Sequence, residues 1–157
     1  MDLEIKDLIN SGIKGLTPYE PGKPIEDLER EYGIKNAIKL ASNESPLGPS
    51  PKVLEVLKEV ISGIHRYPDG NGSRLKEALS RRHSISTDML TLGNGSNDII
   101  EFVARCFLTP NDNAVYSKHA FAVYPLVTKS LGAQGVEVEA KDWGHDLQAM
   151  LDAINDK

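Results

Sequence analysis

A glycine-rich turn between an apolar run and a helical pattern is the part of this chain best suited to bind an anion. Residues 92–101 read Leu-Gly-Asn-Gly-Ser-Asn-Asp-Ile-Ile-Glu. Gly93 and Gly95 permit positive φ and close backbone approach, and Ser96 or Asn97 can cap the helix that follows. The first turn of a helix has unpaired N–H groups and about half a positive charge, which suits a phosphate monoester. The alternative is a capped turn without a ligand, because the spacing matches neither the dinucleotide fingerprint nor the P-loop.

The elements that must position this turn are predicted from hydrophobic periodicity. Residues 89–92, Met-Leu-Thr-Leu, are predicted to form a buried strand before the turn. The helix after the turn has an apolar face with helical spacing, made of Ile99, Ile100, Phe102, Val103, Cys106 and Phe107. Since the only cysteine, Cys106, lies on that face, we expect a buried structural thiol and not a nucleophile.

Strands and helices alternate in the rest of the C-terminal half. Strands are predicted over residues 113–117 and 134–140, and a helix over 123–131. A last helix begins after Asp146, which is expected to cap it. This alternation is typical of an α/β protein with a mostly parallel sheet. The series stops after a helix, without the strand that should return to the sheet.

The N-terminal half is richer in proline and in loops. A short helix is predicted over residues 1–10, and prolines and glycines over residues 16–24 predict an extended arm that lies across another surface, such as a neighbouring subunit. The remaining predicted elements are helices over 25–32, 51–61 and 73–83, a strand over 37–41, and polar loops over 42–49 and 66–72.

Composition limits the class of protein and its partners. The chain has 157 residues, of which 39% are hydrophobic and 26% charged, which is ordinary for a soluble globular protein. A net charge of −5 without a basic stripe argues against nucleic acid as the main partner. The first residues lack the apolar core of a signal peptide, and no apolar run approaches the ~18 residues of a membrane span. We therefore expect a cytoplasmic protein without a membrane partner, and we predict no metal site.

Five segments, taken together in their order and spacing, resemble a known family. They are residues 19–24 (Tyr-Glu-Pro-Gly-Lys-Pro), 40–48 (Leu-Ala-Ser-Asn-Glu-Ser-Pro-Leu-Gly), 67–70 (Tyr-Pro-Asp-Gly), 93–97 (Gly-Asn-Gly-Ser-Asn) and 120–125 (Ala-Phe-Ala-Val-Tyr-Pro). The sequence resembles fold-type I enzymes that use pyridoxal 5′-phosphate, and within them the histidinol-phosphate aminotransferases. The resemblance implies a three-layer α/β/α fold with a mostly parallel sheet.

The same resemblance implies a division of the chain and a set of binding residues. Residues 1–50 would form the N-terminal arm and a substrate-side loop, and residues 51–157 the first part of the large cofactor-binding domain. The residues implied to bind the cofactor phosphate are Gly95, Ser96 and Asn97, and Tyr67 would reach the cofactor phosphate of the other subunit of a homodimer. Phe121 would stack on the pyridine ring of the cofactor. Tyr19 and Asn43 would lie on the substrate side.

Each of these side chains also has a simpler interpretation. Phe121 could be an ordinary core aromatic at a helix start, and Tyr19 and Asn43 could merely order the arm through hydrogen bonds. The family often has an aromatic residue where His119 stands, and His119 is expected to be a surface or capping residue rather than an acid–base group.

The resemblance also implies that catalytic groups are missing from this chain. In the family, the lysine that forms the Schiff base, the aspartate that pairs the pyridinium nitrogen and the arginine that takes the substrate carboxylate all lie beyond the last residue here. We therefore predict an N-terminal fragment, inactive by itself and without a catalytic residue. The complete transaminase would exchange an amino group between L-histidinol phosphate and 2-oxoglutarate in histidine biosynthesis.

Two other functions remain open at this stage. A related pyridoxal-phosphate-dependent aromatic aminotransferase or phospho-amino-acid decarboxylase would have much the same cofactor-binding residues. A non-catalytic module that binds a phosphate ligand or a protein would account for the absent lysine. An encoding frame that continues into a strand, an Asn-Pro-rich turn and a Ser-x-x-Lys loop would decide for the enzyme.

Overall fold

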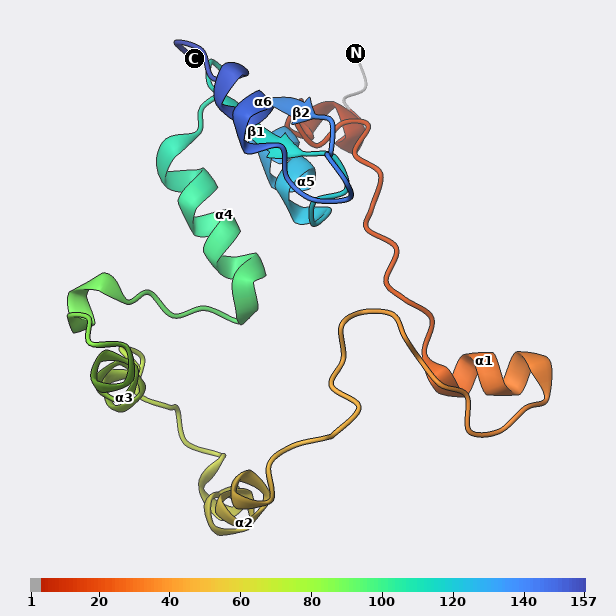
Figure 1. The fold of residues 1–157 in the computed structure, drawn as a ribbon, viewed down its shortest axis with the longest axis vertical. Helices are drawn as coiled ribbons and strands as arrows, with labels where there is room; N and C mark the ends of the chain where they lie inside the picture. The colour runs from red at the N-terminus through yellow and green to blue at the C-terminus, as the bar shows by residue number, and fades with distance from the viewer. Residues whose placement is uncertain (1–3) are drawn as a thin grey trace. The chain divides into compact units, whose positions relative to one another are not determined.

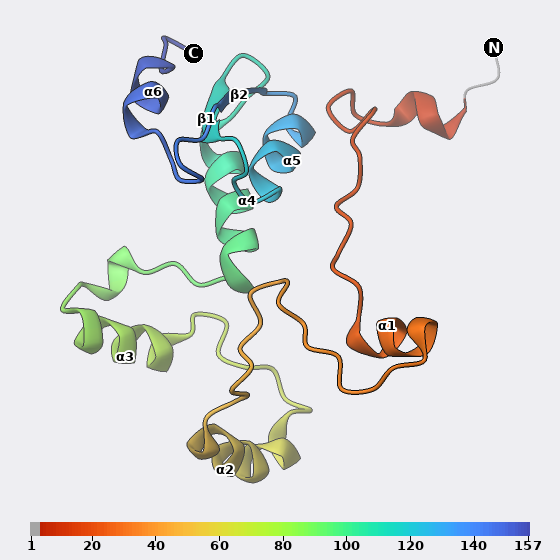
Figure 2. The same ribbon diagram turned by 45° about the vertical axis from the view of Figure 1, so that its right-hand side comes forward.

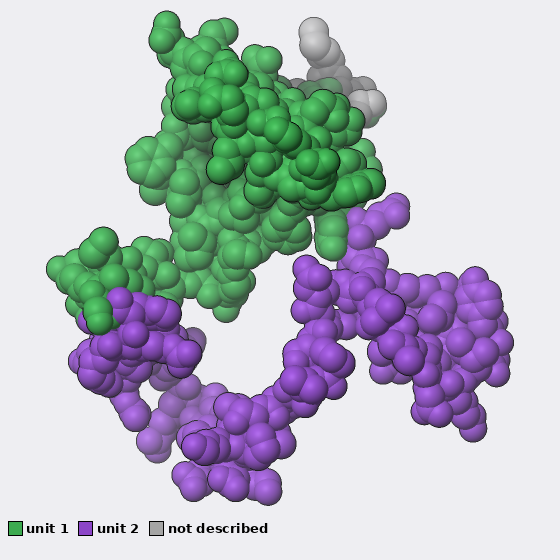
Figure 3. Space-filling view, in the orientation of Figure 1, with its two compact units in different colours: residues 1–19, 84–157 green, residues 20–83 purple. Residues whose placement is uncertain are grey.

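The chain folds into two compact units, one of which combines two separate segments of the sequence. A computed structural model describes residues 4–157, and its elements are labelled in chain order in Figure 1. Unit 1 combines the described residues up to Tyr19 with Ser84–Lys157, and unit 2 is Glu20–His83 (Figure 3). Residue 50, where the sequence places the start of the large domain, falls inside unit 2, so that domain boundary stays a prediction. No helix in the described residues is both long and apolar enough to cross a membrane.

A parallel pair of strands is the centre of unit 1. Strand β1 (Asn113–Ser117) pairs with β2 (Gln134–Val138), with Asn113 opposite Gln134 and Ser117 opposite Val138. Helix α5 (Val123–Ser130) connects the strands, and α6 (Leu147–Asp152) follows β2. The two helices lie on opposite sides of the strand pair (Figure 2). The predicted parallel α/β arrangement is confirmed, although β2 ends two residues before the predicted residue 140.

The buried residues of unit 1 belong to α4, β1, α5 and the turn between α5 and β2. Among residues 4–157, the buried side chains are Ala104, Ser117, Val123, Thr128 and Ala133. The buried hydroxyl of Thr128 donates a hydrogen bond to the carbonyl of Tyr124 at 2.8 Å, so its polarity is satisfied within the helix. At the start of α6, Asp146 accepts a hydrogen bond from the amide of Ala149 at 3.0 Å, which confirms the predicted cap.

The N-terminal segment of unit 1 docks on the C-terminal end of α5. It contains a short 3₁₀ helix, η1 (Ile5–Leu8), so part of the predicted helix exists, while residues 1–3 of that prediction lie outside the described residues. Lys129 Nζ donates to the carbonyl oxygen of Gly15 at 3.0 Å. A Cβ at Gly12 would lie 2.8 Å from the amide nitrogen of Gly132, so only glycine allows this approach.

Two sequence predictions around α4 (Gly95–Phe107) are wrong. Residues 89–92 form no strand: η3 (Thr87–Met89) ends there, and Leu90 has extended dihedrals, φ −114° and ψ 122°, without a paired strand in the described chain. Cys106 is exposed, not buried. Helix α5 packs against only part of the apolar face of α4: Ala104 is buried there, whereas Phe102 and Phe107 stay 44% and 75% exposed.

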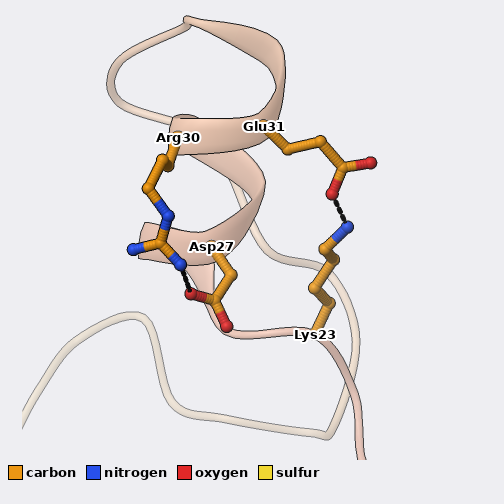
Figure 4. A network of polar contacts seen from close by, with 4 residues as sticks. All are labelled: Lys23, Asp27, Arg30 and Glu31. Carbon is orange, nitrogen blue, oxygen red and sulfur yellow. Dashed lines mark hydrogen bonds and ion pairs between the residues drawn. The ribbon is translucent and has the colours of Figure 1, made fainter.

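Unit 2 contains α1 (Ile25–Tyr32), α2 (Pro51–Val60), η2 (Ile61–Gly63) and α3 (Ser73–His83). Helix α1 ends as predicted at Gly33, whose φ of 65° lets its N–H bond the carbonyl of Glu29. Figure 4 shows ion pairs around α1, between Lys23 and Glu31 and between Arg30 and Asp27. These exposed pairs add little stability because water screens them.

The strand predicted over residues 37–41 is also wrong. That segment has no strand partner in the described chain, and Ile38 and Leu40 are 86% and 96% exposed. Helix α2 likewise presents half-exposed apolar side chains, including Val53, Val56 and Leu57. The alternation of apolar residues was real, but a strand exists only where a second strand accepts its backbone hydrogen bonds.

Candidate functional site

The glycine turn before α4 has the backbone geometry that its sequence predicts. Gly95 has a φ of 76°, a conformation that L side chains rarely adopt. A Cβ at Gly93 would lie 2.8 Å from the Cβ of Asp98 and 3.0 Å from the Cδ1 of Ile99, so this position too requires glycine. Both glycines are therefore used to bring bare backbone to the start of the helix.

The predicted helix cap at Ser96 or Asn97 is wrong. The helix begins at Gly95, with Asn94 at the capping position and no side-chain cap bond. Instead, Asp98 Oδ2 accepts a hydrogen bond from the amide of Asn94 at 2.8 Å, which links the first turn of the helix to the residue before it. An acidic residue in the first turn of a helix was the sequence signal for this contact.

Ser96 and Asn97 lie exposed in the first turn of α4, and neither is the cap. The amide groups of that turn have no carbonyl four residues earlier within the helix. The Gly95 amide donates to the carbonyl of Gly93 at 2.9 Å. The amides after it, with the Ser96 hydroxyl and the Asn97 carboxamide at the start of a 13-residue helix, form a donor set that fits a phosphate group. The carboxylate of Asp98 is engaged with the Asn94 amide, which limits its repulsion of an anion.

Phe121 lies in the loop between β1 and α5, beside a cavity at the carboxyl end of β1. The cavity has a volume of about 570 Å³, and its lining includes Tyr116, His119, Phe121, Tyr124, Trp143 and His145. Phe121 is 47% exposed, so the alternative of an ordinary core aromatic is wrong. Ligands of parallel α/β sheets bind outside the carboxyl ends of the strands, and this ring is available there.

The phenol of Tyr116 lies in the same cavity and has a raised pKa. Partial burial is the main cause, and the negative charge of Glu137 adds to it. The ring packs over Gly135 of β2, where a Cβ would lie 2.9 Å from Cζ of the phenol. Tyr116 therefore stays neutral and can act as a hydrogen-bond donor or acceptor at this edge of the cavity.

Tyr67 and Asn43 belong to unit 2. Tyr67 is fully exposed, as its polar loop predicts. Two residues later Asp69 accepts hydrogen bonds from the amides of Asn71 at 3.0 Å and Ser73 at 2.8 Å, which lowers the pKa of its carboxyl group and starts α3. Sequence analysis missed this role of Asp69, although an aspartate before Gly-Asn-Gly-Ser indicates such a turn.

The loop around Asn43 has an unusual backbone. Ser42 and Asn43 both have positive φ, 67° and 50°, and an ion pair of 3.1 Å between Lys39 and Glu44 spans them. Tyr19, 55% exposed, belongs to unit 1 with the glycine turn and Phe121. The roles of these residues in binding stay predictions.

An α/β unit in which a glycine turn opens a helix is typical of proteins that bind a phosphorylated ligand. The family model for aminotransferase class I and II matches residues 35–157. The chain therefore belongs to the class I and II aminotransferases.

Proteins similar to this chain point within that family to one group. The chain is 54% identical to histidinol-phosphate aminotransferase 1 of Nitrosococcus oceani over 94% of this chain and 40% of that protein. It is 55% identical to histidinol-phosphate aminotransferase 2 of Pseudomonas fluorescens over 96% of this chain and 41% of that protein. The 157 residues thus span about two fifths of the length of these relatives.

A solved structure has the same fold. The crystal structure of histidinol-phosphate aminotransferase from Sinorhizobium meliloti in complex with pyridoxal 5′-phosphate matches with a TM-score of 0.80 and 27% sequence identity. The match covers 92% of this chain and 38% of that one. The chain therefore has the fold of a pyridoxal-phosphate-dependent aminotransferase, for the part that it covers.

Proposed function

We propose that these 157 residues form the N-terminal part of a cytoplasmic aminotransferase in histidine biosynthesis. The enzyme exchanges an amino group between L-histidinol phosphate and 2-oxoglutarate, with pyridoxal 5′-phosphate as cofactor. The observation that carries the proposal is the exposed Gly-Asn-Gly-Ser-Asn turn at the start of α4, in a chain of this family. The names of the similar proteins support the substrate.

The residues of this chain supply binding and orientation. Backbone amides of the α4 start, with the Ser96 hydroxyl and the Asn97 carboxamide, hold the cofactor phosphate. Phe121 covers one face of the pyridine ring. Bound in this way, the cofactor supplies an electron sink for amino-group transfer. Tyr19 and Asn43 contact the substrate from the arm and the Asn-Glu loop.

A comparison of substrates tests the proposed activity. We expect the full-length enzyme to have a kcat/KM for L-histidinol phosphate at least about tenfold above that for L-tyrosine or L-phenylalanine. The reason is that hydrogen-bond donors that pair with the substrate phosphate stay unpaired when the substrate has no phosphate. The measurement is glutamate formation with 2-oxoglutarate as acceptor. Equal values would favour an aromatic aminotransferase, release of CO₂ a decarboxylase, and no turnover a binding module.

A second prediction concerns the homodimer. If Tyr67 reaches the cofactor phosphate of the other subunit, active sites are shared and only the dimer is active. The full exposure of Tyr67 within unit 2 supports this role, since its hydroxyl is open to a partner. We expect sedimentation to show a dimer, and Tyr67→Phe to weaken cofactor binding about tenfold or more, because one hydrogen bond to a charged group is worth ~1.5–3 kcal/mol. A fully active monomer at nanomolar concentration would reject the shared site.

A further inference from the structure

The β1–α5 loop, which carries Phe121, contacts the end of β2 and the loop between β2 and α6. The amide of Lys118 donates to the carbonyl of Val138 at 2.7 Å, and Lys118 Nζ donates to Glu139 Oε1, also at 2.7 Å, which raises the pKa of the lysine. Further along both loops the rings of His119 and Trp143 face each other, with centroids 5.6 Å apart and planes tilted by 36°. Residues 118 and 119 thus contact the end of β2 and the β2–α6 loop through a backbone hydrogen bond, an ion pair and a ring contact.

The residues that bear these two rings have a restricted backbone. His119 has a φ of 66° and Trp143 a φ of 63°, both in the left-handed region that L residues seldom adopt. The loop around Trp143 is closed by paired backbone hydrogen bonds between Lys141 and Gly144, at 2.8 and 3.1 Å. Left-handed residues outside glycine persist where surrounding contacts hold them, and such positions cluster at functional sites.

His119 stands only two residues before Phe121. The amide of Ala120 donates to the carbonyl of Ser117 at 3.1 Å, and the carbonyl of Phe121 accepts from the amide of Tyr124 at 3.0 Å, so hydrogen-bonded turns lie on both sides of the Ala120–Phe121 bond. Phe121 and Trp143 line the same cavity, yet Trp143 is 89% exposed. A ring so exposed gains little from burial, and the aromatic contact that the structure gives it is with His119.

We propose that Trp143 is a positioning residue for the cofactor ring, acting through His119 on the turn that presents Phe121. The inference rests on the proposed function, because it assigns Phe121 to the ring of the cofactor. Without the ring contact, the turn keeps its backbone hydrogen bonds but gains freedom at residue 119, and the Phe121 face loses its fixed angle toward the ligand.

The test uses the full-length enzyme, freed of cofactor and titrated with pyridoxal 5′-phosphate. Trp143→Ala should weaken cofactor binding by about three- to tenfold, the value of an aromatic pair. It should also reduce the visible circular dichroism of the bound cofactor, which reports how rigidly its ring is held. Trp143→Phe should restore both, because it keeps an aromatic face against His119. Lys141→Ala is the matched control in the same loop, since its hydrogen bonds to Gly144 are made by backbone atoms.

The variants separate this inference from the proposed function. Phe121→Ala tests the stacking role directly: unchanged binding and dichroism in that variant would overturn the role proposed for Phe121 and this inference with it, whereas the proposed activity is tested separately by the comparison of substrates. A weakened Phe121→Ala beside a Trp143→Ala that keeps both affinity and dichroism would overturn the inference alone. His119→Ala combined with Trp143→Ala should be no worse than either single change, and full additivity would show that the two rings act independently.

Discussion

Replacing Ser96 and Asn97 together by alanine should weaken retention of pyridoxal 5′-phosphate by the full-length enzyme at least tenfold. Hydrogen bonds to a charged group are worth ~1.5–3 kcal/mol each, and a tenfold loss corresponds to about 1.4 kcal/mol. The expected loss is therefore a lower bound for two such bonds. Both side chains lie exposed in the first turn of α4 and neither caps it, so their removal leaves the helix start in place.

The structure offers a matched control for this measurement. Ser50 precedes α2 and makes no side-chain cap bond, so Ser50→Ala removes a hydroxyl from a helix start without a ligand role. Cofactor affinity, measured by dialysis titration of the cofactor-free enzyme, should fall in the double variant and stay unchanged in the control. An unchanged affinity in the double variant would remove the phosphate site from the α4 turn.

Residues 1–157 by themselves should form no measurable glutamate from L-histidinol phosphate, 2-oxoglutarate and pyridoxal 5′-phosphate. Transamination needs an amine that captures the aldehyde of the cofactor and then moves the Cα proton, and such a lysine has a lowered pKa. The pKa values of two lysines of this chain are raised, not lowered. Glu31 raises the pKa of Lys23, and Glu139 raises that of Lys118, each through a side-chain hydrogen bond.

Two further lysines are already engaged with other groups. Lys39 is paired with Glu44 at 3.1 Å, and Lys129 donates to the carbonyl of Gly15. The assay compares the 157-residue chain with the full-length enzyme at equal concentration. Turnover by the short chain within tenfold of the full-length rate would mean that it contains the catalytic lysine.

Local patterns in the sequence were sufficient for most helices and for the strand pair. The helix over 73–83, the strand over 113–117 and the cap at Asp146 agree with α3, β1 and the start of α6. These features depend on spacing and on turn residues within a few positions, so no distant contact is needed to specify them. The glycine turn belongs to the same group, because positive φ and the lack of a Cβ are properties of the residues themselves.

Tertiary structure decided what depends on a partner far along the chain. Residues 37–41 and 89–92 have strand-like sequences but form no strand, because a strand needs a hydrogen-bonded neighbour. Cys106 lies on an apolar face yet is exposed, because burial needs a covering element. The contact of Trp143 with His119 joins residues 24 positions apart and has no local signal. The half-exposure of Phe121 likewise depends on the cavity that the loops after β1 and β2 line together. Only the folded structure shows that this ring is exposed and not buried in the core.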